Sequence, residues 1–185
     1  MISINVIMLL FEGMFLFRSK KWIEAIELFE RCLVLDPENP DALNYKGRIL
    51  SRLGRYDESI SCFEKLVKSH PTFAYGWQNL GIVLCNKKLY SNAIECFDKM
   101  LSIKPSEYLT WNDKGNALYY MGQFEDAITS YDKALNIKED FMEPWRAKAY
   151  AYHKLGRHDE AISCVKRAKE LGWSPELKTA NNGNT

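Results

Sequence analysis

The residues that could do chemistry in this chain do not form a catalytic pattern. The cysteines are odd in number and none is paired as Cys-x-x-Cys, which argues against a disulfide framework or a zinc site. Reduced, structural thiols of a cytoplasmic protein are therefore predicted. The cysteines are Cys32, Cys62, Cys85, Cys96 and Cys164.

The histidines offer no metal site in this interpretation. His153 and His158 stand on either side of Gly156, so they do not share one helix face as a pair of metal ligands would. His70 directly precedes a proline. We expect all of them to be structural or exposed to solvent.

Adjacent carboxylates occur at the starts of predicted helices, where negative charge complements the helix dipole. These pairs are Asp57-Glu58, Glu125-Asp126 and Asp159-Glu160. The sequence contains no phosphate-binding glycine loop, no nucleophile elbow and no His-Glu-x-x-His. We therefore predict a protein that is not an enzyme and that needs no cofactor or metal.

The organisation of the chain is a stronger signal than its chemistry, because residue types recur with a period of 34. One column of the repeat is Gly13, Gly47, Gly81, Gly115 and Ala149. A second is Ala25, Ser59, Ala93, Ala127 and Ala161, and a third is Phe29, Phe63, Phe97, Tyr131 and Val165. A period of this length indicates a stacked array of one supersecondary unit.

Each unit is predicted to be two helices joined by a tight turn, because two apolar stripes of helical period flank a break. Glycine at the break takes the left-handed conformation that ends a helix, and lysine in its place costs about 1 kcal/mol. The break is Gly54, Gly122 or Gly156 in three units and Lys20 or Lys88 in two. Within one unit we expect Gly115 and Ala127 to face each other, with Leu118 and Tyr131 filling the space around them. Pro37, Pro71 and Pro105 end successive units.

One unit carries Trp77, Leu80, Gly81, Leu84, Tyr90, Ala93, Phe97 and Pro105. This run resembles the signature of the tetratricopeptide repeat. Five units fit the resemblance, at residues 6–39, 40–73, 74–107, 108–141 and 142–175. It implies an all-α fold, an α-solenoid in which antiparallel helix pairs form a right-handed superhelix. Residues 1–175 are then a single array, and 176–185 a short tail that we expect to be partly disordered.

After the first helix, the pattern predicts helices at 21–35, 40–53, 56–69, 74–87, 90–103, 108–121, 124–137, 142–155 and 158–171. A further short helix could begin at Ser174.

The first seventeen residues are apolar around most of a helix circumference. A secretory signal is disfavoured because no Lys or Arg precedes the run and no small-residue cleavage site follows it. A membrane span is disfavoured because the run is shorter than about 20 residues and contains Asn5 and Glu12. The first helix of the first unit is favoured, since Gly13 is in phase. Its outer face, with Ile2, Ile4 and Phe11, is uncovered, and we hypothesise that it forms a homodimer.

The charges exclude strong electrostatic attraction to nucleic acid or to an anionic membrane, because 25 basic residues balance 24 acidic ones. What remains is binding of protein. The family resemblance implies a concave groove, lined by the first helix of each unit, that receives a peptide or a partner helix. The predicted groove residues are Asn44, Arg48, Arg52, Gln78, Asn112, Asn116, Tyr119, Arg146 and Tyr150.

Within this groove the carboxamides of Asn44, Gln78 and Asn112 could pair with a peptide backbone. The basic residues at its ends could select an acidic group. Our leading interpretation is a non-enzymatic interaction scaffold of unknown partner. The alternative is a structural element that self-assembles, or docks, through its apolar N-terminal helix.

Overall fold

The computed structural model describes residues 4–174, which contain ten α-helices and no strand. The helices are α1 (Ile4–Arg18), α2 (Trp22–Leu35), α3 (Pro40–Arg52), α4 (Tyr56–Ser69), α5 (Ala74–Asn86), α6 (Tyr90–Ile103), α7 (Tyr108–Tyr120), α8 (Phe124–Ile137), α9 (Met142–Lys154) and α10 (His158–Glu170). Each helix predicted after the first lies within one residue of its expected bounds. The expected helix from Ser174, the tail 176–185 and Ile2 lie outside the described residues.

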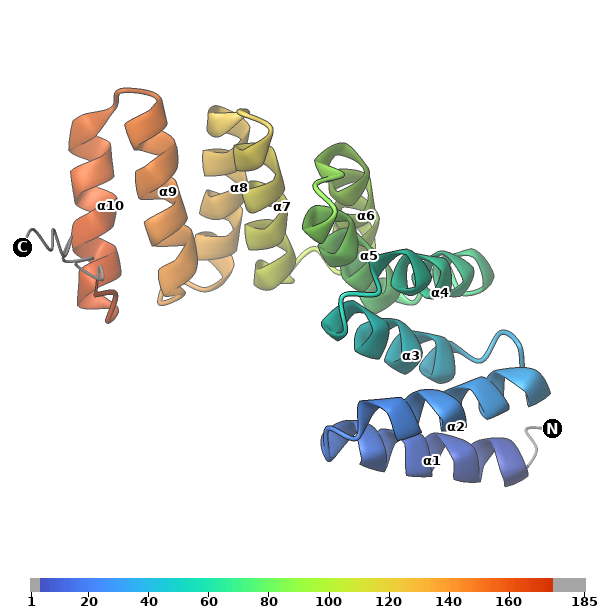
Figure 1. The fold of residues 1–185 in the computed structure, drawn as a ribbon. Helices are drawn as coiled ribbons and strands as arrows, with labels where there is room; N and C mark the ends of the chain where they lie inside the picture. The colour runs from blue at the N-terminus through green and yellow to red at the C-terminus, as the bar shows by residue number, and fades with distance from the viewer. Residues whose placement is uncertain (1–3, 175–185) are drawn as a thin grey trace, which may run out of the picture.

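The helices form an α-solenoid in which consecutive helices pack as antiparallel neighbours (Figure 1). Each odd-numbered helix also contacts the next odd-numbered one, whereas within residues 4–174 no even-numbered helix contacts another. The array therefore curves toward its odd-numbered helices, which form the inner, concave layer. Helix axes run in different directions in the two halves of the array, as expected for a superhelix (Figure 1).

The turn inside each unit has the left-handed residue that the sequence predicts. Gly54, Gly122 and Gly156 have φ of +75°, +79° and +72°. Lys20 and Lys88 take the same place with φ of +59° and +62°. A side chain in this conformation costs about 1 kcal/mol or more, so packing elsewhere in these two units offsets strain at both lysines.

The glycine column lies beneath the aromatic column, and Tyr131 fills the space around Gly115 as the sequence predicts. The nearest atoms to a Cβ at this position belong to the ring of Tyr131, with Cε1 only 2.5 Å away. Gly13, Gly47 and Gly81 lie under Phe29, Phe63 and Phe97 in the same way. Glycine is therefore present because a ring fills the space a side chain would take.

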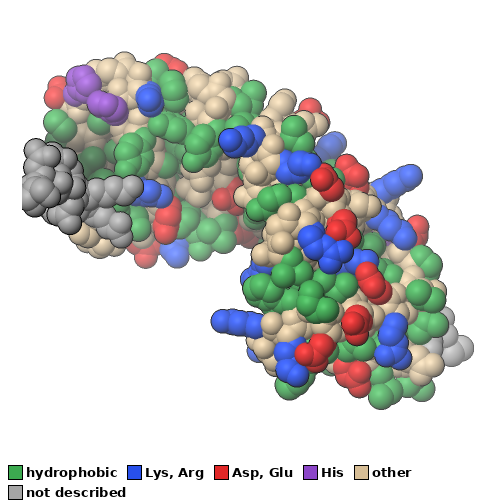
Figure 2. Space-filling view, in the orientation of Figure 1, with side chains coloured by type: hydrophobic (Ala, Val, Ile, Leu, Met, Phe, Trp, Pro, Cys, Tyr) green, Lys and Arg blue, Asp and Glu red, His purple; other side chains and the backbone are tan. Residues whose placement is uncertain are grey.

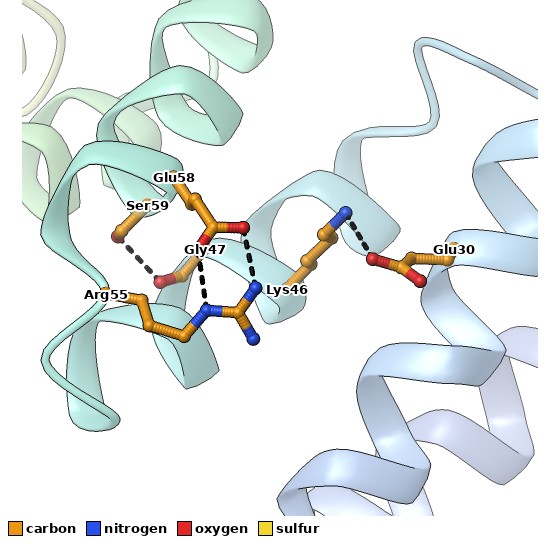
Figure 3. A network of polar contacts seen from close by, with 6 residues as sticks. All are labelled: Glu30, Lys46, Gly47, Arg55, Glu58 and Ser59. Carbon is orange, nitrogen blue, oxygen red and sulfur yellow. Dashed lines mark hydrogen bonds and ion pairs between the residues drawn. The ribbon is translucent and has the colours of Figure 1, made fainter.

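The alanine column also lies against the first helix of its unit. The contact is seen most directly where serine replaces alanine in this column. Ser59 occupies this column, and its hydroxyl donates a hydrogen bond of 2.7 Å to the carbonyl oxygen of Gly47 (Figure 3). The bond satisfies a hydroxyl that is otherwise fully buried.

The junctions between units carry two recurring polar contacts. The indole Nε1 of Trp77, Trp111 and Trp145 donates to a carbonyl oxygen of the preceding turn, at Pro71, Pro105 and Glu139 respectively. A lysine of one unit also pairs with an acid on the preceding even-numbered helix. These ion pairs are Lys46–Glu30 (Figure 3), Lys114–Asp98 and Lys148–Asp132.

The first junction differs, because leucine stands where the later units have tryptophan. Here the carboxamide of Asn39 caps α3, its Oδ1 accepting a 3.0 Å bond from the backbone nitrogen of Ala42.

Candidate binding groove

The inner layer contains a hollow of about 380 Å³ between α7, α8 and α9. We name it the tyrosine hollow, and its lining residues are Asn116, Tyr119, Tyr120, Tyr131, Arg146, Ala147 and Tyr150. The structure thus brings together Asn116, Tyr119, Arg146 and Tyr150, four residues that the sequence predicts for the groove.

Polar groups in the tyrosine hollow are oriented by one hydrogen bond. The hydroxyl of Tyr131 donates to Oδ1 of Asn116 at 2.9 Å. Burial raises the pKa of the Tyr131 phenol, so the hydroxyl stays protonated and remains a donor at neutral pH. Because Oδ1 of Asn116 faces Tyr131, the two N–H groups on Nδ2 are left for other acceptors.

Aromatic rings form the exposed wall of the tyrosine hollow. Tyr120 and Tyr150 are 67% and 47% exposed. Tyr120 stacks on Tyr90 with ring centroids 5.4 Å apart, and Tyr119 meets Tyr120 edge-on at 5.8 Å. Such rings offer apolar contact area at low conformational cost, together with hydroxyl groups at their tips.

A second hollow, of about 480 Å³, adjoins the first, because Asn116 and Tyr120 line both. Asp113 lies in its wall together with Cys85. Burial raises the pKa of Asp113 to about 6, and side-chain hydrogen bonds with Gln78 and Asn112 oppose only part of that rise. The inner layer is thus hollowed continuously from α5 to α9.

The side chains of the predicted carboxamide column are largely buried, whereas binding a peptide backbone needs exposed amide groups. Asn44, Gln78 and Asn112 are only 9%, 9% and 8% exposed. Nδ2 of Asn79 donates a 2.9 Å hydrogen bond to Oδ1 of Asn44, which lies 35 residues earlier on the neighbouring inner helix. Gln78 interacts with Asp113 across the same separation, and this interaction opposes part of the rise in the pKa of Asp113. Side chains of this column therefore interact with the next inner helix, and we call each such polar pair a rung. This corrects the expectation that the column is open to a peptide backbone.

The third rung of this ladder is missing. Position 147, which lies 35 residues after Asn112, is alanine, and the buried Oδ1 of Asn112 has no hydrogen-bond partner within the described residues. Ala147→Asn is expected to supply that partner and to raise the free energy of unfolding by about 1 kcal/mol, measured by urea denaturation. The same substitution in an Asn112→Ala background should give no gain, and an equal gain there would contradict the ladder.

Arg48 and Arg52 lie away from the tyrosine hollow, on α3. The guanidinium of Arg48 stacks 4.9 Å from the ring centroid of Phe17, and that of Arg52 lies 5.3 Å from the same ring. These cation–π contacts join α3 to α1. Among the predicted basic residues, Arg146 is the one that the structure places in the tyrosine hollow.

Two groove residues were missed at the sequence level. Asp113 is one, and its position in the sequence, 35 residues after Gln78 on the next inner helix, could have indicated that the two side chains lie close together. Tyr131 is the other, because its hydroxyl distinguishes it from the phenylalanines of its column.

The remaining reactive groups are placed as follows. Burial raises the pKa of the Cys85 thiol to about 11 and that of Cys96 to about 12, so both stay protonated at neutral pH. His153 and His158 lie on different helices, as expected, but the turn brings their ring centroids within 5.7 Å of each other. Histidine side chains lie side by side at the C-terminal end of the array (Figure 2). Across residues 4–174, no three His, Cys, Asp or Glu side chains are grouped to hold a metal.

Models of the tetratricopeptide repeat match the chain along most of its length. Two described as tetratricopeptide repeat match residues 16–80, and residues 74–107 and 145–171. A third, described as TPR repeat, matches 115–156. The chain belongs to the tetratricopeptide repeat family. Its repeats make it a protein-interaction or assembly scaffold.

The tetratricopeptide array is similar to solved structures of MamA. One, a crystal structure of MamA protein, has a TM-score of 0.85 and 23% identity, covering 90% of this chain and 91% of that one. Another, residues 41 to the end of MamA from Desulfovibrio magneticus RS-1, has a TM-score of 0.88 and 19% identity, covering 92% and 97%. Likeness at these identities shows the fold alone. No curated protein matches the sequence.

None of the described helices combines the length and the apolarity needed to cross a bilayer.

Proposed function

We propose that residues 1–175 act as a single non-enzymatic scaffold of the cytoplasm, binding an extended segment of a partner protein along α5, α7 and α9. The observation that carries the proposal is the tyrosine hollow, where exposed rings, one arginine and one oriented carboxamide converge on the concave layer. Convergent polar groups in a mainly aromatic concavity are typical of a binding site.

The chemistry of the tyrosine hollow defines the kind of segment that it would accept. Tyr120 and Tyr150 offer contact to an apolar or aromatic side chain. Arg146 can pair with a carboxylate, and Nδ2 of Asn116 can donate to a backbone carbonyl. The preferred segment therefore carries an apolar anchor beside an acidic residue.

Selection from a displayed library of random peptides on the full chain tests this proposal. Peptides of that composition should be enriched, and fluorescence polarisation should then show that Tyr150→Ala weakens their binding about tenfold. Ile137→Ala is the control, because Ile137 is 42% exposed and lies on α8, outside both the tyrosine hollow and the helices of the proposed binding surface. Failure to enrich any peptide, or equal losses in both variants, would reject the groove.

Assembly through the N-terminal helix is the second candidate, and exposed apolar side chains favour it. Ile4 and Phe11 are 76% and 70% exposed on α1, and Val34 at the end of α2 is 80% exposed. Contiguous apolar surface of this kind marks an interaction site. Phe11→Asp should abolish self-association in sedimentation velocity while leaving peptide binding intact, and Tyr150→Ala should do the reverse.

A further inference from the structure

The faces at the two ends of the described array match the two sides of an internal junction. From α3 onward, each inner helix buries one face against the preceding unit. Ile49, Val83, Ala117 and Ala151 share one column of that face and are at most 1% exposed. In α1 the same column holds Phe15, which is 68% exposed. Helix α1 thus presents, uncovered, the face that later inner helices bury.

The other end presents the opposite side of a junction. Ile26 and Ile128 share a column on the even-numbered helices and are 6% and 7% exposed, and Ile60 and Ile94 in the same column are partly buried. Ile162 holds the same place on α10 and is 66% exposed. It lines an apolar hollow that also contains Val165 and Trp173.

Charges at these two ends are reversed relative to the internal junctions. In three of the four junctions, lysine on the inner helix pairs with an acid 16 residues earlier on the preceding even-numbered helix. The fourth has Leu80 in the lysine position. The equivalent positions at the ends hold Glu12 on α1 and Lys166 on α10, both exposed. Glu12 of one copy could therefore pair with Lys166 of another, with the acid on the inner helix and the lysine on the even-numbered helix.

The two ends also differ from the internal junctions in which helix carries the large side chain and which carries the small one. Inside the array, a ring on the even-numbered helix shares a buried cluster with a smaller residue of the next inner helix. These combinations are Phe29 with Ile49, Phe63 with Val83 and Phe97 with Ala117. At the ends the small residue, Val165, is on α10 and the ring, Phe15, is on α1. The ring that α10 lacks would be supplied by the partner helix.

We propose that α1 of one copy packs on α10 of a second copy in the register of an internal junction, so that copies join head to tail. This inference rests on the self-association candidate described above and specifies its geometry. Because the contact is heterologous, it does not close on itself in a dimer, and assemblies should lengthen as concentration rises.

Charge reversal in the full chain tests the head-to-tail contact by sedimentation velocity over a concentration series. Glu12→Lys and Lys166→Glu should each weaken association about tenfold, since each places like charges opposite one another. An equimolar mixture of the two variants should recover association, and so should the double variant, because every contact then joins opposite charges. Lys65→Glu makes the same change in net charge as Lys166→Glu, but on exposed surface of α4, and should have no effect.

The outcomes separate this geometry from self-association in general. A wild-type mass that stops at a dimer, lost with Glu12→Lys but not with Lys166→Glu, would overturn head-to-tail packing in favour of a symmetric α1 contact. Head-to-tail packing would also be overturned if Lys166→Glu left association unchanged. A monomeric wild type at every concentration would overturn both this inference and the self-association candidate, while peptide binding in the tyrosine hollow would be unaffected.

Discussion

Asp113→Asn should raise the free energy of unfolding at neutral pH by up to about 3 kcal/mol. Burial raises the pKa of Asp113 from 3.8 to about 6. Each pKa unit corresponds to about 1.4 kcal/mol, so the ionised carboxylate destabilises the folded chain by that order. Asparagine removes the charge and can still bond Gln78, as Asn79 bonds Asn44 in the previous unit.

The effect has a defined pH dependence. The folded state binds the Asp113 proton more tightly than the unfolded state, so wild-type stability from this group falls as pH rises from about 4 to about 6. Wild type and Asp113→Asn should therefore converge below pH 4 and differ fully above pH 6, in urea denaturation followed by circular dichroism. A constant offset between the two at all pH values would contradict this origin.

Asp113→Leu serves as the control for the hydrogen bond. It should lose the same pH dependence, because it also lacks the carboxylate. It should nevertheless be less stable than Asp113→Asn, since the buried side chain of Gln78 loses its partner.

Gly81→Ala should lower the free energy of unfolding by about 1 to 3 kcal/mol, even though alanine favours a helix by about 1 kcal/mol. A Cβ at Gly81 would lie 2.5 Å from Cε1 of Phe97, whose ring is fully buried. The ring must shift to admit the Cβ, and we expect the cost of displacing this fully buried ring to outweigh the gain in helix propensity. Urea denaturation measures the loss.

A double-mutant cycle isolates this contact. In a Phe97→Val background, Gly81→Ala should cost nothing or should stabilise, because the ring is gone. The fifth unit already has this combination, with Ala149 and Val165 in the two positions. An equal cost of Gly81→Ala in both backgrounds would show that the ring is not responsible.

The helices and turns were predictable because their causes are local. Apolar periodicity places each helix, and Gly54 or Gly122 ends one, so the bounds follow from a few neighbouring residues. Even the strained turns at Lys20 and Lys88 follow from their phase in the repeat.

The candidate site was predictable only in part, because side-chain depth depends on the distance between units. The repeat assigns Asn44 and Gln78 to the inner helices, but it does not show that Asn79 and Asp113 reach them from the next unit. The contact between Gly115 and Tyr131 was easier to predict, because both columns change together in the fifth unit, to Ala149 and Val165.

The missing rung between Asn112 and Ala147 has a mechanical consequence. A hydrogen bond between Asn44 and Asn79 joins α3 to α5, and Gln78 interacts with Asp113 between α5 and α7, whereas the described contacts between α7 and α9 include no such polar pair. The tyrosine hollow opens at this interval. We therefore expect the spacing of α7 and α9 to adjust when a partner enters, so that an incoming segment can set the local radius of the solenoid instead of having to match it.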